Sequence, residues 1–79
     1  MKARVTVTLK SGVLDPQGQA ITGSLKSLGF DGVSAVRQGK IFDLELGDAD
    51  PADARMPLAA MCEKILANTV IENFAIELV

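Results

Sequence analysis

The sequence predicts an α+β protein of the ferredoxin-like class, a two-layer sandwich in which a four-stranded antiparallel sheet carries both helices on one face. Strand-like and helix-like segments alternate in the order βαββαβ. Two βαβ-type crossovers, each with the usual right-handed preference, bring both helices to the same side of the sheet. The 79 residues leave room for one domain, residues 1–79, with no linker.

The first predicted strand ends in a turn that leads into a capped helix. Apolar and polar residues alternate over residues 5–10, which is typical of a half-buried strand. Gly12 then lets the chain turn, and Asp15 is a good N-cap because its carboxylate can accept from free amides of the first helical turn. Pro16 suits the first helical position because its φ angle is already helical. We therefore expect a helix from Pro16 to about Leu28.

An apolar stripe at helical spacing, Ile21, Leu25 and Leu28, predicts which side of this helix is buried, and Gly29 is expected to end it. A second strand is predicted over residues 33–37. Gln38-Gly39 then reads as a tight hairpin turn. The third strand follows, with an inward apolar face made by Phe42, Leu44 and Leu46.

The second helix has two possible starts. With Asp50 as the cap and Pro51 first, Pro57 lies inside the helix and kinks it; alternatively, Pro57 is itself a first-turn residue. From there, apolar residues keep helical spacing: Leu58, Met61, Cys62, Ile65 and Leu66. Asn68 is placed for a left-handed C-terminal cap, and residues 74–78 form the last strand.

The composition restricts the class of protein. The net charge of −2 and the pI near 4.9 argue against a nucleic-acid partner. No apolar run is long enough to span a membrane, and no signal peptide precedes the first strand, so a cytoplasmic location is expected. The hydrophobic content of 48% is high for so small a chain. We therefore expect a homo-oligomer, a dimer or a dimer of dimers.

The chain offers little catalytic chemistry. It has no histidine, which removes the commonest general base and metal ligand. The single cysteine, Cys62, lies on the apolar stripe and is expected to be structural. Asp48, Asp50 and Asp53 lack the spacing of a calcium loop, and helix capping explains Asp50 or Asp53 more simply. The run from Gly12 to Gly18 lacks the ending of a phosphate-binding loop. We expect no catalytic, metal or cofactor site.

Four charged residues are candidates for a partner interface. Asp43 and Glu45 share one strand face about 7 Å apart. They suit acid–base work or cation binding, or else form a solvated or interface-facing polar surface. Arg37 and Lys40 flank the predicted hairpin turn, where they meet an acidic partner or lie at a solvated tip.

Several separated runs resemble one family, PurS, the small subunit of phosphoribosylformylglycinamidine synthase. The longest carries Gly12, Asp15, Pro16, Gln17 and Gly18, and another runs from Cys62 to Asn68. Shorter matches are Leu9-Lys10 and the segments 36–40 and 70–72. The resemblance covers essentially the whole chain, and the runs agree in order and spacing.

The resemblance implies a non-catalytic subunit of a glutamine-dependent carbon–nitrogen ligase of purine biosynthesis. Such a subunit joins a large ATP-dependent synthetase subunit to a glutaminase subunit and helps ammonia pass between them. ATP, magnesium and glutamine then belong to the partner subunits, and this chain binds no cofactor. The rival interpretation is a free-standing module that binds an amino acid between paired ferredoxin-like domains, which the same topology would allow.

Overall fold

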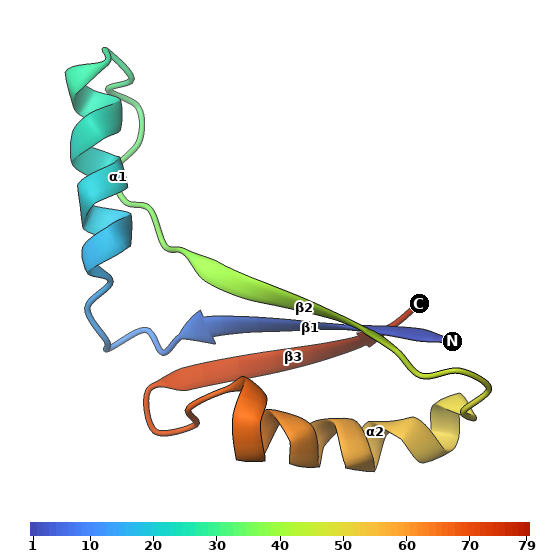
Figure 1. Cartoon of the computed structure of the whole chain (residues 1–79). Coiled ribbons are helices and arrows are strands. Elements are labelled where there is room, and N and C mark those ends of the chain that lie inside the picture. Colours follow the sequence, from blue (N-terminus) through green and yellow to red (C-terminus); the bar gives the residue numbers. More distant parts are fainter.

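The computed structural model describes residues 1–79 as an L-shaped molecule (Figure 1). It contains three strands and two α-helices, the second of which continues into a short π-helix. Their bounds are β1 Lys2–Leu9, α1 Pro16–Ser27, β2 Gly39–Glu45, α2 Pro51–Met61, the π-helix η1 Cys62–Leu66 and β3 Glu72–Leu78.

The strands form one antiparallel sheet in the order β2-β1-β3. Val5 on the central strand lies opposite Phe42 on β2 and Ile76 on β3, so apolar residues share one face. Ala3, Val5 and Val7 are completely or almost completely buried, as the alternation of β1 predicts. The sheet, α2 and η1 form the body of the molecule, residues 2–9 and 39–79.

Helix α2 covers the apolar face of the sheet and lies alongside β3 (Figure 1). Leu58 packs with Ala3 and Ala54, and Cys62 packs with Val5 and Val7. Because one helix covers this face, the inward side chains on the outer strands stay half-buried; they are Phe42, Leu44, Phe74, Ile76 and Leu78.

Helix α1 stands away from the body, which corrects the predicted fold class. The sheet has three strands instead of four, and α1 does not lie on it (Figure 1). The radius of gyration is 16.0 Å, compared with about 12 Å for a compact chain of this length. We call residues 16–36 the arm. The apolar stripe of α1 is consequently open, with Leu28 73% exposed.

The predicted strand over residues 33–37 and the predicted turn at Gln38-Gly39 are both wrong. Residues 31–38 return along α1 without pairing to any strand, and the chain continues from Gln38 directly into β2. Gly39 has no positive φ angle. A Cβ atom there would lie 2.7 Å from the carbonyl oxygen of Val7, so this glycine permits a close approach of two strands.

The second helix begins at Pro51 with Asp50 as its cap, which decides between the two predicted starts. The Asp50 carboxylate accepts from the amide of Ala52 at 2.8 Å. Pro57 lies inside the helix and is exposed. Asn68 is not a left-handed cap, since no residue other than glycine has a positive φ. Its side chain instead accepts from the amide of Val70 at 3.2 Å.

Candidate functional site at the base of the arm

The arm joins the body through a cluster that we call the elbow, made of Asp15, Gly18, Arg37 and Gln38. Asp15 caps α1 with one carboxylate oxygen, which accepts from the amide of Gly18 at 2.8 Å. Its other oxygen accepts from the amide of Gln38 at 2.8 Å, on the returning segment. A single carboxylate, only 5% exposed, therefore ties the start of the helix to the start of β2.

Arg37 crosses the elbow in the other direction. Its guanidinium donates to the carbonyl oxygens of Val13 at 2.9 Å and Lys10 at 3.0 Å. These carbonyls belong to the connection between β1 and α1, so Arg37 holds together the two chain segments that lead into and out of the arm. A planar guanidinium with several donors suits this task because it satisfies more than one acceptor at a time.

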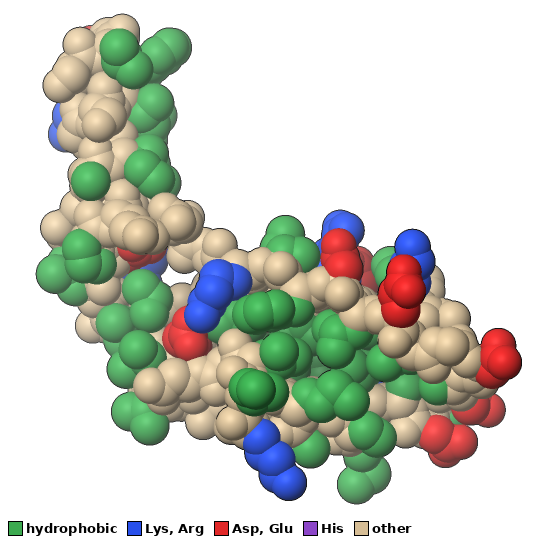
Figure 2. All heavy atoms as spheres, viewed as in Figure 1, with side chains coloured by type: hydrophobic (Ala, Val, Ile, Leu, Met, Phe, Trp, Pro, Cys, Tyr) green, Lys and Arg blue, Asp and Glu red, His purple; other side chains and the backbone are tan.

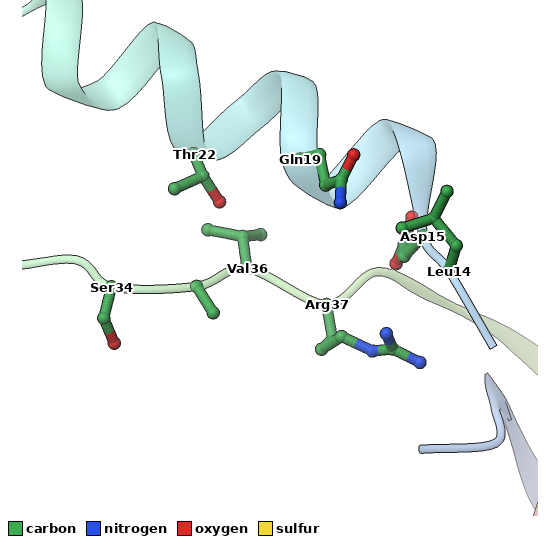
Figure 3. Close-up of a pocket in the computed structure, with 8 residues that line it drawn as sticks. Leu14, Asp15, Gln19, Thr22, Ser34, Val36 and Arg37 are labelled. Atoms are coloured by element: carbon green, nitrogen blue, oxygen red, sulfur yellow. The ribbon is translucent and has the colours of Figure 1, made fainter. Parts of the chain in front are cut away.

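Gly18 lets the returning segment pass directly over the first turn of α1. A Cβ atom at this position would overlap the carbonyl oxygen of Val36 and lie 3.0 Å from the Asp15 carboxyl carbon. An open pocket of about 310 Å³ lies between helix and segment, and Figure 3 shows Val36 facing Thr22 across it. Gly18 therefore serves the elbow through its lack of a side chain.

The charged groups of the elbow are engaged in hydrogen bonds within the chain. The carboxylate of Asp15 is occupied by backbone amides, and the Arg37 guanidinium by carbonyls. These amide donors, with a smaller effect of nearby Arg37, lower the pKa of Asp15 below its ordinary value. An anion held by fixed donors is suited to orient the arm.

The structure separates the four charged residues that the sequence proposed for a partner interface. Arg37 lies in the elbow, whereas Lys40 points to the helix-covered side of the sheet, where its amino group lies 3.5 Å from Glu72. Asp43 and Glu45 share the opposite, uncovered face, as their spacing predicts. Asp43 pairs there with Arg4 at 2.8 Å, and this guanidinium lowers the pKa of the Asp43 carboxyl.

Sequence reasoning missed Glu72 and Gln38. Glu72 accepts from the amide of Asn68 at 2.7 Å, so it orders the connection between η1 and β3, and this hydrogen bond lowers its pKa. Gln38 contributes a backbone amide, for which a side-chain pattern gives no signal. The charge of Glu72 is visible in the sequence, but the partners of its carboxylate, the Asn68 amide and Lys40, are set by the tertiary fold.

The remaining residues singled out from the sequence lie apart from the elbow. Cys62 is fully buried, and burial raises the pKa of its thiol. Gly12 lies in the turn before the arm with no atom close to a built Cβ, and Gln17 is exposed in the first turn of α1. No group of three or more cysteine or acidic side chains gathers into a metal site. Neither helix has the length and apolarity to cross a bilayer.

The lowered pKa of Asp15 predicts a pH effect on stability. Because the folded pKa lies below the unfolded value of about 3.9, the carboxylate stabilises the fold above that pH. This contribution is lost as the pH falls through the folded pKa. In urea unfolding, Asp15→Asn should be less stable than the native chain at pH 7, and the two should converge below about pH 4. A gap that stays constant down to pH 2 would contradict this role of the charge.

The comparisons with known proteins agree over nearly the full length. The family model PurS, phosphoribosylformylglycinamidine (FGAM) synthase, matches residues 2–79. The PurS subunit of Synechocystis is 51% identical over 75 residues, which are 95% of this chain and 75% of that protein. Bacillus subtilis PurS, 45% identical, superimposes with a TM-score of 0.86 over 96% of this chain and 94% of that one.

A third match comes from a complex. The PurLQS structure of Thermotoga maritima contains a chain 29% identical to this one, with a TM-score of 0.86 over 96% of this chain and 93% of that one. The L-shaped arrangement of arm and body is thus the fold of solved PurS proteins. The resemblance carried by the runs around Asp15 and Cys62 is confirmed. The chain belongs to the PurS family of phosphoribosylformylglycinamidine synthase subunits.

Proposed function

We propose that this chain is the non-catalytic subunit of a phosphoribosylformylglycinamidine synthase, and that it joins a large synthetase subunit to a glutaminase subunit. The assembled enzyme makes formylglycinamidine ribonucleotide from formylglycinamide ribonucleotide with glutamine and ATP. In this proposal the chain assists the passage of ammonia between the two partners, which themselves bind glutamine, ATP and magnesium.

The observation that carries this proposal is full-length membership in the PurS family, together with an elbow whose charged groups hold the arm in position. The PurLQS structure supports it, since a chain of the same fold occurs there in a complex. The elbow uses its charged groups to hold the arm, and the chain contains no histidine. A rigid projecting arm on a small body suits a subunit that positions larger proteins.

We further propose that the chain works as a homodimer. Large apolar side chains are exposed on both arm and body, including Leu28 and Phe30 on the arm and Ile41 and Val70 on the body. Apolar surface of this extent on a soluble chain marks contact with other proteins. Sedimentation of the purified chain should therefore give a dimer at micromolar concentration.

Reconstitution with the two partner subunits tests the coupling role. Omitting this chain should abolish product formation with glutamine as nitrogen source, because ammonia is then neither released nor transferred in a joined complex. The same synthetase supplied with free ammonium should retain its activity, because its own active site is unchanged. The purified chain alone should turn over neither substrate.

Two outcomes would contradict the proposal. Full glutamine-dependent activity in the absence of this chain would remove the coupling role. Failure of the chain to co-elute with the synthetase during turnover, with glutamine, ATP and substrate present, would remove the assignment to the complex. Omission of the glutaminase serves as the matched control, since it should cause the same loss with glutamine and leave activity with ammonium intact.

A further inference from the structure

The tip of the arm carries an aspartate followed directly by a glycine. Residues 28–32 connect the end of α1 to the returning segment, and Asp31 and Gly32 are both exposed there. Figure 2 shows the arm standing clear of the body, with its tip at the end away from the sheet. Asp-Gly pairs are common in turns of this kind because both residues tolerate unusual backbone angles. The tip therefore stands in water.

The two groups that would react with each other at this tip are both free. The hydrogen bonds that aspartates accept in this chain go to Asp15, Asp43 and Asp50, and neither ion pair involves Asp31. The amide of Gly32 donates to no acceptor. A Cβ atom built at Gly32 meets no atom within 4 Å, so the space around this amide is open. The Asp31 carboxyl and the next amide nitrogen can therefore approach each other.

The other aspartates of the chain lack this freedom. Asp15 and Asp50 precede prolines, which have no amide proton. Asp43 and Asp53 lie in β2 and α2, where regular hydrogen bonding holds the backbone. The amide that follows Asp48 is already bonded within its turn. Only the aspartate at the arm tip combines a free carboxyl with a free and unhindered neighbouring amide.

We propose that Asp31-Gly32 is a site of spontaneous isoaspartate formation in the folded chain. The Gly32 amide nitrogen attacks Cγ of the protonated Asp31 carboxyl, and a nitrogen–carbon bond forms. The amide proton and the carboxyl hydroxyl leave together as water, which gives a cyclic succinimide. Glycine favours this step because it has no Cβ to hinder the approach.

Hydrolysis of the succinimide has two products. Water adds to one of the two ring carbonyl carbons. If the bond from nitrogen to Cγ then breaks, aspartate is restored. If the bond from nitrogen to the main-chain carbonyl carbon of Asp31 breaks, an isoaspartate remains, whose main chain runs through Cβ and Cγ. One water leaves and one returns, so the reaction needs neither an oxidant nor a partner subunit and stands apart from the coupling role.

The modified chain is expected to stay folded. An isoaspartate keeps the negative charge and lengthens the main chain by one atom. Before the site, the amide of Phe30 is bonded to the carbonyl oxygen of Leu25 at 2.9 Å. After it, the amide of Gln38 is bonded to Asp15 at 2.8 Å. The extra atom lies between these two hydrogen bonds, so the isomer accumulates as a folded chain of the same mass and charge.

The proposed homodimer is expected to leave this site in water. The cores of protein interfaces are depleted of charged residues. The Asp31 carboxylate has no cation beside it, so covering it would remove its hydration without compensation. The reaction is therefore expected in the assembled chain as well as in the free one.

The first test compares the folded chain with the synthetic peptide of residues 27–37. Both are kept at about 37 °C and about pH 6, where more of an ordinary aspartate is protonated than at neutral pH. Trypsin releases the same peptide from the chain by cleavage after Lys26 and Arg37. Electron-transfer fragmentation then distinguishes isoaspartate from aspartate, and reaction in ¹⁸O water labels each molecule that has passed through the succinimide.

The folded chain should form isoaspartate at Asp31 at no less than about one-fifth of the rate of the peptide, because the tip is as open as an unfolded segment. A lower rate would show that the fold protects the site and would overturn the proposal. An equal amount of product at Asp48, which is also exposed, would overturn the selectivity for the tip.

The second test is Gly32→Ala, with Gly12→Ala as its matched control. Neither glycine has a positive φ, and no atom lies within 4 Å of a Cβ built at either, so both variants should fold. Gly32→Ala should slow the reaction at Asp31 at least about fivefold, because its methyl group hinders the approach of the amide. Gly12→Ala should leave the rate unchanged. Equal rates in the two variants would show that cyclisation on the Gly32 amide is not the route.

Discussion

Gly18→Ala is expected to destabilise the chain by about 1–3 kcal/mol, although alanine is the better helix former. The new methyl group would overlap the carbonyl oxygen of Val36, which belongs to the backbone and cannot rotate away. The returning segment must therefore move outward, and this motion weakens the hydrogen bond from the Gln38 amide to Asp15. Urea unfolding at one fixed protein concentration measures the loss.

The matched control is Gly23→Ala in the same helix. Apart from the adjacent backbone of α1 itself, no atom lies within 4 Å of a Cβ built at Gly23, so this change should be neutral or stabilise the chain by about 0.5–1 kcal/mol. The hydrogen-exchange rate of the Gln38 amide gives a second, local measurement. This amide should exchange faster in Gly18→Ala and remain protected in Gly23→Ala. Equal stability of the two variants would show that the elbow does not need a glycine at position 18.

Leu58→Ala is expected to destabilise the chain even more than Gly18→Ala. Leu58 is completely buried between α2 and the sheet, where it packs with Ala3 and Ala54. Truncation of a buried leucine costs about 2–5 kcal/mol, compared with a total of about 4–12 kcal/mol for a chain of 79 residues. The melting temperature should fall by about 10–25 °C.

Met56→Ala on the same helix is the control, because its side chain is 85% exposed and its loss should change stability by less than about 0.5 kcal/mol. Calorimetry of both variants and the native chain at one concentration gives the comparison. If Leu58→Ala melted within a few degrees of the native chain, then α2 would contribute little to the core, contrary to its packing against β1 and β3.

Local sequence signals predicted most helix and strand positions. Pro16 and Asp15 placed the start of α1 correctly, and Gly29, with a φ of 93°, follows its end as expected. The alternation of Val5 and Val7 predicted the buried face of β1. These features are encoded by residues close together in the chain, where capping, backbone angles and side-chain periodicity act directly.

Long-range features were harder to predict. The stripe of Ile21, Leu25 and Leu28 has the same spacing whether it packs on its own sheet or on another molecule. Gln38-Gly39 fits a hairpin turn, but its actual course is set by a hydrogen bond from the Gln38 amide to Asp15, 23 residues earlier. The separation of Lys40 from Asp43 was implicit in strand alternation, yet their partners Glu72 and Arg4 depend on the sheet.

By itself, then, the sequence determined the local elements, the burial of β1 and Cys62, the family and the absence of histidine chemistry. Only the tertiary structure decided that the sheet has three strands, that Gly18 and Asp15 build an elbow, and that α1 projects as an arm. The physical reason is that apolar periodicity encodes which side of a helix needs cover. It does not encode which surface buries that side. In this chain, a few hydrogen bonds at the elbow direct the helix away from its own sheet.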